Sequence, residues 1–242
     1  METVDYSKIS ITAKLVAYFR QFSDIPFAQD VASYVKAEDA LSEIASKLSI
    51  DAALQPQIAN ESKIYAPLLE ARYKSIVQVI LRTGLKQVLE LASGFSLRGL
   101  AMTQNPEVFY VESDLSGIND EKNKLIASLR KTHELSDFGN HHIVTANALD
   151  RSELESATIS LKRDQPLVIV NEGLIPYLSA EERTVLAGNV RYLLSQFAGG
   201  AWITPDFTTR QLANNVSEYI KRFREAIRGI TDRQLQEAAF DS

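Results

Sequence analysis

Apolar residues in the first 84 positions follow a helical pattern, and no convincing strand is seen there. They recur at helical spacing at Ile9, Leu15, Val16 and Phe19. Pro26 closes that segment, and a second helix is predicted from about Glu38 to Leu48. A third helix is expected to open at Pro67, where proline suits the first turn, and to stop at Gly84. The first part of the chain is therefore predicted to be helical.

Beyond residue 84, short apolar runs alternate with helical stretches. The predicted strands are Gln87–Leu91, Val108–Val111, Ile143–Ala146, Leu167–Val170 and Ala201–Thr204. Such alternation is typical of βαβ units, so we predict an α/β fold with a parallel sheet. We expect two parts: residues 1–84 as N-terminal helices, and residues 85–242 as an α/β core with C-terminal helices.

Two capping boxes mark helix starts in the second part. Ser179 with Glu182 opens a helix that ends at Gly199–Gly200. Thr231 with Gln234 opens the last predicted helix. From residue 207 to the end, no segment alternates like a strand. We therefore expect only helices after the fifth strand.

Composition narrows the functional classes. A formal net charge of -5 argues against a broad nucleic-acid footprint, and no apolar run approaches a membrane span. The N-terminus lacks the pattern of a signal peptide. The absence of cysteine excludes disulfides, thiolate catalysis and Cys-ligated zinc, and no metal site is predicted. We expect a cytoplasmic protein that binds neither nucleic acid nor membrane.

The turn after the first strand is a candidate ligand loop, because ligands of parallel sheets bind beyond the carboxyl ends of the strands. Glu90 is followed by the small residues Ala92, Ser93 and Gly94. The spacing differs from the G-x-G-x-x-G of dinucleotide-binding enzymes, which disfavours a nicotinamide oxidoreductase. A nucleoside without phosphates fits better, although a plain strand-to-helix turn remains the alternative.

Carboxylates and an amide follow the next strands. Glu112 is the first candidate to bind ribose hydroxyls because it is placed at the strand end, and Asp114 is the second. Asp114 could instead cap the following helix. Asn147, with Ala148, suits the edge of an adenine, or is an ordinary turn residue.

The fourth strand ends in Glu172, which should be partly buried and need a partner. A structural or helix-capping role is the alternative for this carboxylate. Tyr177, Asp206 and Phe207 are the candidates to contact the substrate, and Tyr177 and Glu172 are the catalytic candidates. The three histidines are expected to be structural or superficial, and Trp202 is expected in the core.

Several segments resemble, in order, the leucine carboxyl methyltransferase family, which includes tetracenomycin-type polyketide O-methyltransferases. They are Thr12–Ala17, Ala71–Tyr73, Val88–Gly94, Glu112–Leu115 and Asn171–Leu178. The resemblance implies a Rossmann-like class I methyltransferase fold with an N-terminal helical lid and S-adenosylmethionine as methyl donor. The family often has a second glycine where this chain has Phe95-Ser96-Leu97, and an Asp in place of Asn147.

The resemblance also implies roles at individual positions. Arg72 would grip the donor's carboxylate, and the turn from Ala92 to Gly94 would pass under its methionine part. Glu112 would bind the ribose, with Asn147 and Ala148 near the adenine. Glu172 would face the donor's amino end or the methyl group.

From these features we expect an O-methyltransferase acting on a carboxylate or hydroxyl of a small, polyketide-like acceptor. A protein C-terminal carboxyl methyltransferase and an inactive donor-binding protein are the alternatives, and a homodimer is left open. A full class I sheet has seven strands, so the final hairpin is expected to be missing, either by truncation or as an unusual feature. A C-terminal helix or a second subunit would then cover the fifth strand.

Overall fold

The computed structural model describes residues 7–47, 55–209 and 238–240. The chain forms two compact units, whose described parts are 7–47 with 55–75, and 76–209 with 238–240. The division falls within helix α4 (Gln55–Thr83), between Ser75 and Ile76. The predicted two-part organisation with a boundary at residue 84 stays a prediction.

The first unit is helical in its described part. It contains α1 (Ser7–Arg20), α2 (Ala28–Tyr34), α3 (Ala37–Lys47) and α4 as far as Ser75. The prediction that a helix starts at Pro67 is wrong, because α4 begins at Gln55 and contains this proline in its interior. An interior proline removes one backbone hydrogen bond, and the many other hydrogen bonds of this long helix compensate for that loss.

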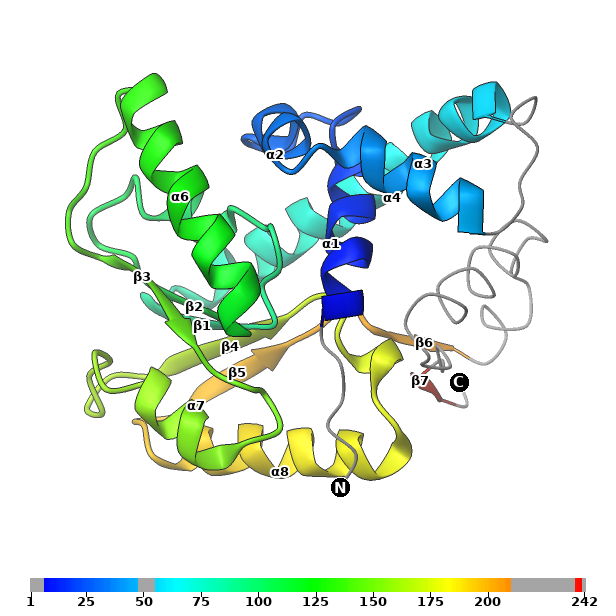
Figure 1. Ribbon diagram of the computed structural model, residues 1–242. Helices are drawn as coiled ribbons and strands as arrows, with labels where there is room; N and C mark the ends of the chain where they lie inside the picture. The colour runs from blue at the N-terminus through cyan, green and yellow to red at the C-terminus, as the bar shows by residue number, and fades with distance from the viewer. Residues whose placement is uncertain (1–6, 48–54, 210–237, 241–242) are drawn as a thin grey trace. The chain divides into compact units, whose positions relative to one another are not determined.

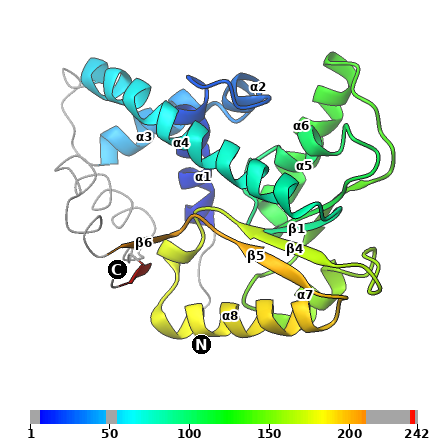
Figure 2. The same cartoon turned by 180° about the vertical axis from the view of Figure 1, so that it is seen from behind.

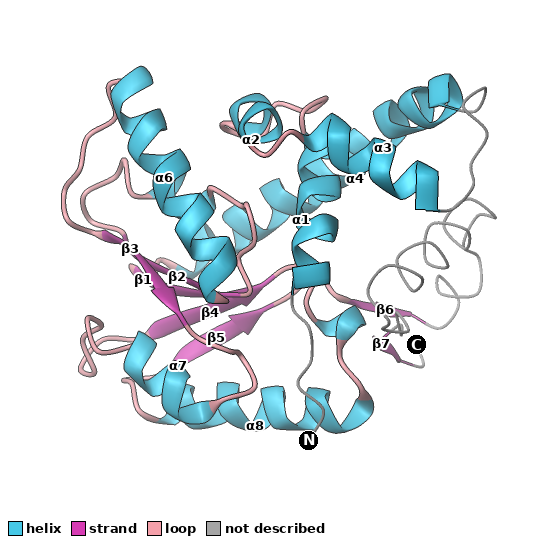
Figure 3. Cartoon of the chain, viewed as in Figure 1, coloured by secondary structure: helices cyan, strands magenta, loops and turns pink. Residues whose placement is uncertain are grey.

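A five-stranded parallel sheet forms the centre of the second unit (Figure 3). Its strands are β1 (Gln87–Leu91), β2 (Phe109–Asp114), β3 (His141–Thr145), β4 (Leu167–Asn171) and β5 (Gly200–Ile203). The order is β3-β2-β1-β4-β5, with every pair parallel. The predicted α/β fold with a parallel sheet is confirmed. The order reverses between β1 and β4, which places a ligand-binding switch point at their carboxyl ends.

Helices cover both faces of this sheet, which explains its apolar strands. On one face lie α7 (Arg151–Ala157) and α8 (Ala180–Ser195) (Figure 1). They pack on the odd-numbered residues of β1, β2 and β4. On the other face lie the end of α4, α5 (Arg98–Met102) and α6 (Ser116–Thr132), and Figure 2 shows α5 from behind. Side chains alternate along a strand, so the even-numbered residues of β1 and β2 face this second layer.

Helix starts follow the local sequence. The predicted capping box of α8 is confirmed, with Ser179 and Glu182 each accepting a hydrogen bond from the other's backbone. Asp150 caps α7 by accepting from the backbone of Ser152 and Glu153. The predicted helix that opens at Thr231 lies outside the described residues.

Two short strands follow the main sheet. β6 (Phe207–Thr209) and β7 (Ala238–Phe240) pair in parallel with each other in a separate two-stranded sheet. The expectation that no strand follows residue 204 is therefore wrong, because three-residue strands are too short to show an alternating pattern. Being parallel, the pair is not a hairpin. Within the residues described, β5 pairs with β4.

Candidate functional site

The loop after β1 turns tightly at the switch point. Ala92 and Gly94 both have positive φ, 50° and 51°, a conformation that favours glycine and is costly for alanine. The Ser93 backbone N–H donates to the Ser113 carbonyl at 3.0 Å, and the Gly94 N–H donates to Asp114 Oδ2 at 2.6 Å. The loop is thereby fixed to the end of the neighbouring strand β2.

Asp114, and not Glu112, ends strand β2. The premise that Glu112 lies directly at the strand end is therefore wrong. The other oxygen of Asp114, Oδ1, accepts from the Leu115 N–H at 2.8 Å, and an ionised carboxylate has further acceptor capacity. Burial raises the pKa of Asp114, and the two backbone hydrogen bonds only partly oppose this rise. The side chain lies at the carboxyl edge of the sheet.

Glu112 is fully buried among partners of its own. Its Oε1 accepts from the Gly99 N–H at 2.9 Å and lies 3.1 Å from His141 Nε2, and its Oε2 forms an ion pair with Lys122. Burial alone would raise the pKa of Glu112, but the charge of Lys122 and the contact with His141 lower it to about 2. The carboxylate belongs to an internal network, in which His141 has the structural role expected of the histidines.

β3 begins at His141, two residues before the predicted start. The polar side chains of His141 and His142 hide the strand from a search for apolar runs. His142 stacks on Phe109, with ring centroids 4.9 Å apart. Both histidines lie at the amino end of a parallel strand, away from the carboxyl edge.

A buried arginine connects the two strands that flank the switch point. Arg98, the first residue of α5, is fully buried and forms ion pairs with Glu90 of β1 and with Glu172. Tyr110 Oη donates to the second oxygen of Glu90 at 2.8 Å. Burial and the nearby negative charge of Glu112 raise the pKa of Glu90, against the effect of Arg98. Glu172 thus has the partner that the sequence analysis expected.

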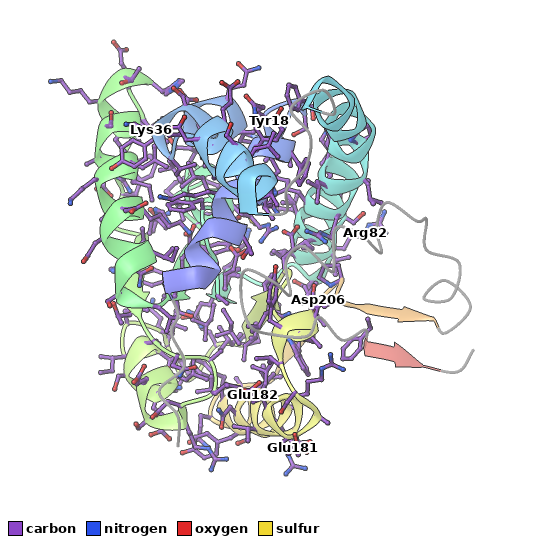
Figure 4. The ribbon with its side chains drawn as sticks, turned by 45° about the vertical axis from the view of Figure 1, so that its right-hand side comes forward. Tyr18, Lys36, Arg82, Glu181, Glu182 and Asp206 are labelled. Carbon is purple, nitrogen blue, oxygen red and sulfur yellow. The ribbon has the colours of Figure 1, made fainter. Side chains whose placement is uncertain are left out.

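Asp206, labelled in Figure 4, holds the loop that follows β4. Its carboxylate accepts hydrogen bonds from the backbone N–H groups of Gly173 at 2.7 Å, Leu174 at 2.9 Å and Ile175 at 3.0 Å. Asn171 Nδ2 adds a fourth hydrogen bond at 2.8 Å. Asp206 therefore positions this loop, and its predicted contact with substrate stays a prediction.

The adenine candidates occupy a turn. Asn147 Oδ1 accepts from the Leu149 N–H at 3.0 Å, the pattern of an ordinary turn residue. Ala148 is buried, and its carbonyl accepts from Asn189 Nδ2 at 3.2 Å. Contact with an adenine remains a prediction for both residues.

The remaining candidates lie on different elements. Tyr177 ends the 3-10 helix η2 (Ile175–Tyr177), and Phe207 is half-exposed with its ring edge-on to Trp202, 6.3 Å between centroids. Trp202 was expected in the core but is only partly buried. Arg72 lies on α4 within the first unit, and its contact with the donor stays a prediction.

Comparisons with known proteins agree with this architecture. The family model "Leucine carboxyl methyltransferase" matches residues 20–191. A Caenorhabditis elegans protein, "Leucine carboxyl methyltransferase 1", is 26% identical over 162 residues, which are 56% of this chain and 48% of that protein. The chain thus spans about half the length of this curated relative.

Two solved methyltransferase structures are similar to this chain. An O-methyltransferase family protein from Burkholderia thailandensis is similar with a TM-score of 0.51 and 15% identity, covering 86% of this chain and 62% of that one. The apo form of the S-adenosylmethionine-dependent methyltransferase SibL is similar with a TM-score of 0.48 and 13% identity, covering 96% of this chain and 63% of that one. The first likeness confirms the Rossmann-like fold.

No helix in the described part of the chain is both long and apolar enough to cross a membrane.

Proposed function

Because the chain belongs to the leucine carboxyl methyltransferase family, we propose that it transfers a methyl group from S-adenosylmethionine to an oxygen of its acceptor. The observation that carries the proposal is the loop after β1, whose Gly94 N–H is bonded to Asp114 at the end of β2. This arrangement lies at the switch point of a parallel sheet, where nucleosides bind.

Asp114 is our candidate for the ribose hydroxyls, in place of Glu112. Its carboxylate lies at the strand end with acceptor capacity left, whereas that of Glu112 is enclosed by Lys122, His141 and Gly99. The turn from Ala92 to Gly94 would pass under the methionine part of the donor. Arg72 would bind the donor's carboxylate with its two-pronged guanidinium.

The charges around the switch point support a cationic ligand. Among the described residues, buried carboxylates lie there beside the buried cations Arg98 and Lys122; they belong to Glu90, Glu112, Asp114 and Glu172. A sulfonium donor with its ammonium group suits a site lined with carboxylates, whereas the diphosphate of a nicotinamide cofactor would be repelled by them.

The donor, when bound, supplies a methyl group already attached to a good leaving group. The protein must orient the acceptor oxygen and exclude water, which can lower the barrier by roughly 7–11 kcal/mol. A general base is needed only for an acceptor that arrives protonated. Glu172 is held by Arg98, so its carboxylate suits binding and orientation better than proton transfer.

For the acceptor, we favour a small organic acid or phenol. The half-exposed ring of Phe207, just after the carboxyl end of β5, supports an apolar acceptor. The name of the Caenorhabditis elegans relative supports a protein C-terminal carboxylate as the second candidate.

Calorimetry tests donor binding. The wild-type protein should bind S-adenosylmethionine in the micromolar range, about -8 kcal/mol, and should not bind NAD. Asp114→Asn should weaken binding of the donor and of S-adenosylhomocysteine alike, because both carry the ribose. The absence of heat and of a thermal shift at near-millimolar donor would remove the proposal.

A transfer assay tests the acceptor. Methyl-labelled donor is incubated with the protein and either a panel of carboxylic acids and phenols or peptides with a free C-terminal carboxylate. Label in the small molecules supports the first acceptor, and label in the peptides supports the second. Tight donor binding without transfer to any member of either panel would indicate a donor-binding protein and contradict the enzymatic proposal.

A further inference from the structure

A fully buried lysine contacts the loop that follows β1. Lys122 projects from α6, and its Nζ donates to Ser93 Oγ at 3.0 Å while it pairs with Glu112. Glu112 in turn accepts from the Gly99 N–H in the first turn of α5. One cation therefore fixes the loop directly near its start and, through a single carboxylate, at its end.

We propose that Lys122 is a positioning residue for donor binding, which sets the conformation of the loop 92–97 without touching the donor. The inference rests on the proposed function, because it assigns the loop to the donor.

The loop needs such support because its backbone is strained. Ser93 lies between Ala92 and Gly94, both in the left-handed region, and a non-glycine residue keeps that conformation only where its surroundings hold it. The hydrogen bond from Lys122 acts on the residue between the two. Burying an ammonium group is costly, and an apolar side chain at this position of α6 would avoid that cost.

A shift of Ser93 would reach the donor's ribose. The Ser93 N–H is bonded to the Ser113 carbonyl, and the next N–H, of Gly94, is bonded to Asp114. If Ser93 moves, Gly94 moves relative to the Asp114 carboxylate. Loss of the Lys122 contact should therefore weaken donor affinity even though Lys122 is enclosed.

Two variants separate positioning from general stability. Ser93→Ala removes the hydroxyl that Lys122 binds and leaves the ion pair with Glu112 in place. The double variant Lys122→Met with Glu112→Gln removes both buried charges, so that neither is left without a partner. Lys86→Met is the control, because it removes an exposed ion pair with Glu107 at the other end of the sheet.

Two measurements are made on each protein. The first is the dissociation constant of S-adenosylmethionine by calorimetry, and the second is the amide hydrogen exchange of the loop 92–97 without ligand. We expect both variants to bind the donor about five- to ten-fold more weakly, as for one lost hydrogen bond. Their loop amides should exchange faster than in the wild type. Lys86→Met should match the wild type in both measurements.

The inference is overturned if Ser93→Ala binds the donor like the wild type and its loop exchanges at the same rate. It is also overturned if Lys86→Met weakens binding equally. If the double variant does not fold, Ser93→Ala still decides. A wild-type protein that does not bind the donor refutes the proposed function, and the exchange rates then show independently whether Lys122 holds the loop.

Discussion

Gly99→Ala should destabilise the protein because the residue has no room for a side chain. A Cβ placed on Gly99 would overlap the Glu112 carboxylate and lie 2.7 Å from His141 Nε2. Gly99 is helical, and its φ is outside the positive region, so backbone strain plays no part. The loss of stability in Gly99→Ala therefore reports on the close approach of α5 to the Glu112 carboxylate of β2.

The magnitude follows from three contributions. Overpacking a filled interior costs about 1–3 kcal/mol. If Glu112 moves aside, the buried N–H of Gly99 loses its acceptor, which costs about 1–3 kcal/mol. The better helix propensity of alanine offsets up to about 1 kcal/mol. We expect a net loss of about 2–4 kcal/mol and a Tm lower by roughly 5–15 °C.

Gly188→Ala is the matched control. Gly188 lies inside α8, and a Cβ there would have no neighbour within 4 Å. This variant should be more stable by about 0.5–1 kcal/mol. Urea unfolding of both variants gives the comparison. Equal stability of Gly99→Ala and Gly188→Ala would refute the assignment of Gly99 as a close-contact position.

Three further predictions concern charged side chains of the candidate site. Arg98→Met leaves Glu90 and Glu172 without their shared cation, so the free energy of unfolding measured in urea should fall by about 3–5 kcal/mol. Adding Glu90→Gln should restore part of this loss. An unchanged free energy of unfolding would contradict the buried ion pairs of Arg98. Asp206→Ala frees the N–H groups of the loop after β4, so amide exchange there should accelerate, whereas unchanged exchange would show that Asp206 does not hold the loop. Because the pKa of Glu112 is lower in the folded protein than its value near 4.5 in the unfolded chain, ionised Glu112 stabilises the fold above pH 4.5. This stabilisation is lost as the pH falls toward 2. The stability difference between wild type and Glu112→Gln should therefore shrink, by on the order of 3 kcal/mol, in urea titrations from pH 6 to pH 2; a constant difference would show that Glu112 has no depressed pKa.

The sheet could be predicted because its central strands β1, β2 and β4 are buried on both faces and therefore contain continuous apolar runs. The end of β2 could not, because Glu112, Ser113 and Asp114 look like a polar loop. These residues continue the strand because each finds a partner: Lys122 for Glu112, the Glu90 carbonyl for the hydroxyl of Ser113, and the Gly94 N–H for Asp114. These partners are brought together only by the tertiary fold, so the apolar pattern of the sequence placed the end of β2 too early.

The buried cations were missed, although one left a signal in the sequence. Lys122 shares the apolar stripe of α6 with Ile118, Leu125 and Leu129, at three- and four-residue spacing. A lysine in such a stripe predicts a buried charge with a carboxylate partner. Arg98 left a weaker signal, because its partners are brought to it only when β1 and β4 pair in the sheet.

The buried carboxylates at the switch point have a consequence for product release. The proposed methyl transfer would convert a sulfonium into a neutral thioether, so the used donor would carry one positive charge fewer than the fresh donor. A site whose fixed charges favour cations holds the spent nucleoside less strongly for that reason alone. In the proposed enzyme, the same carboxylates would attract the donor and promote its exchange after each turnover, and would thereby limit product inhibition.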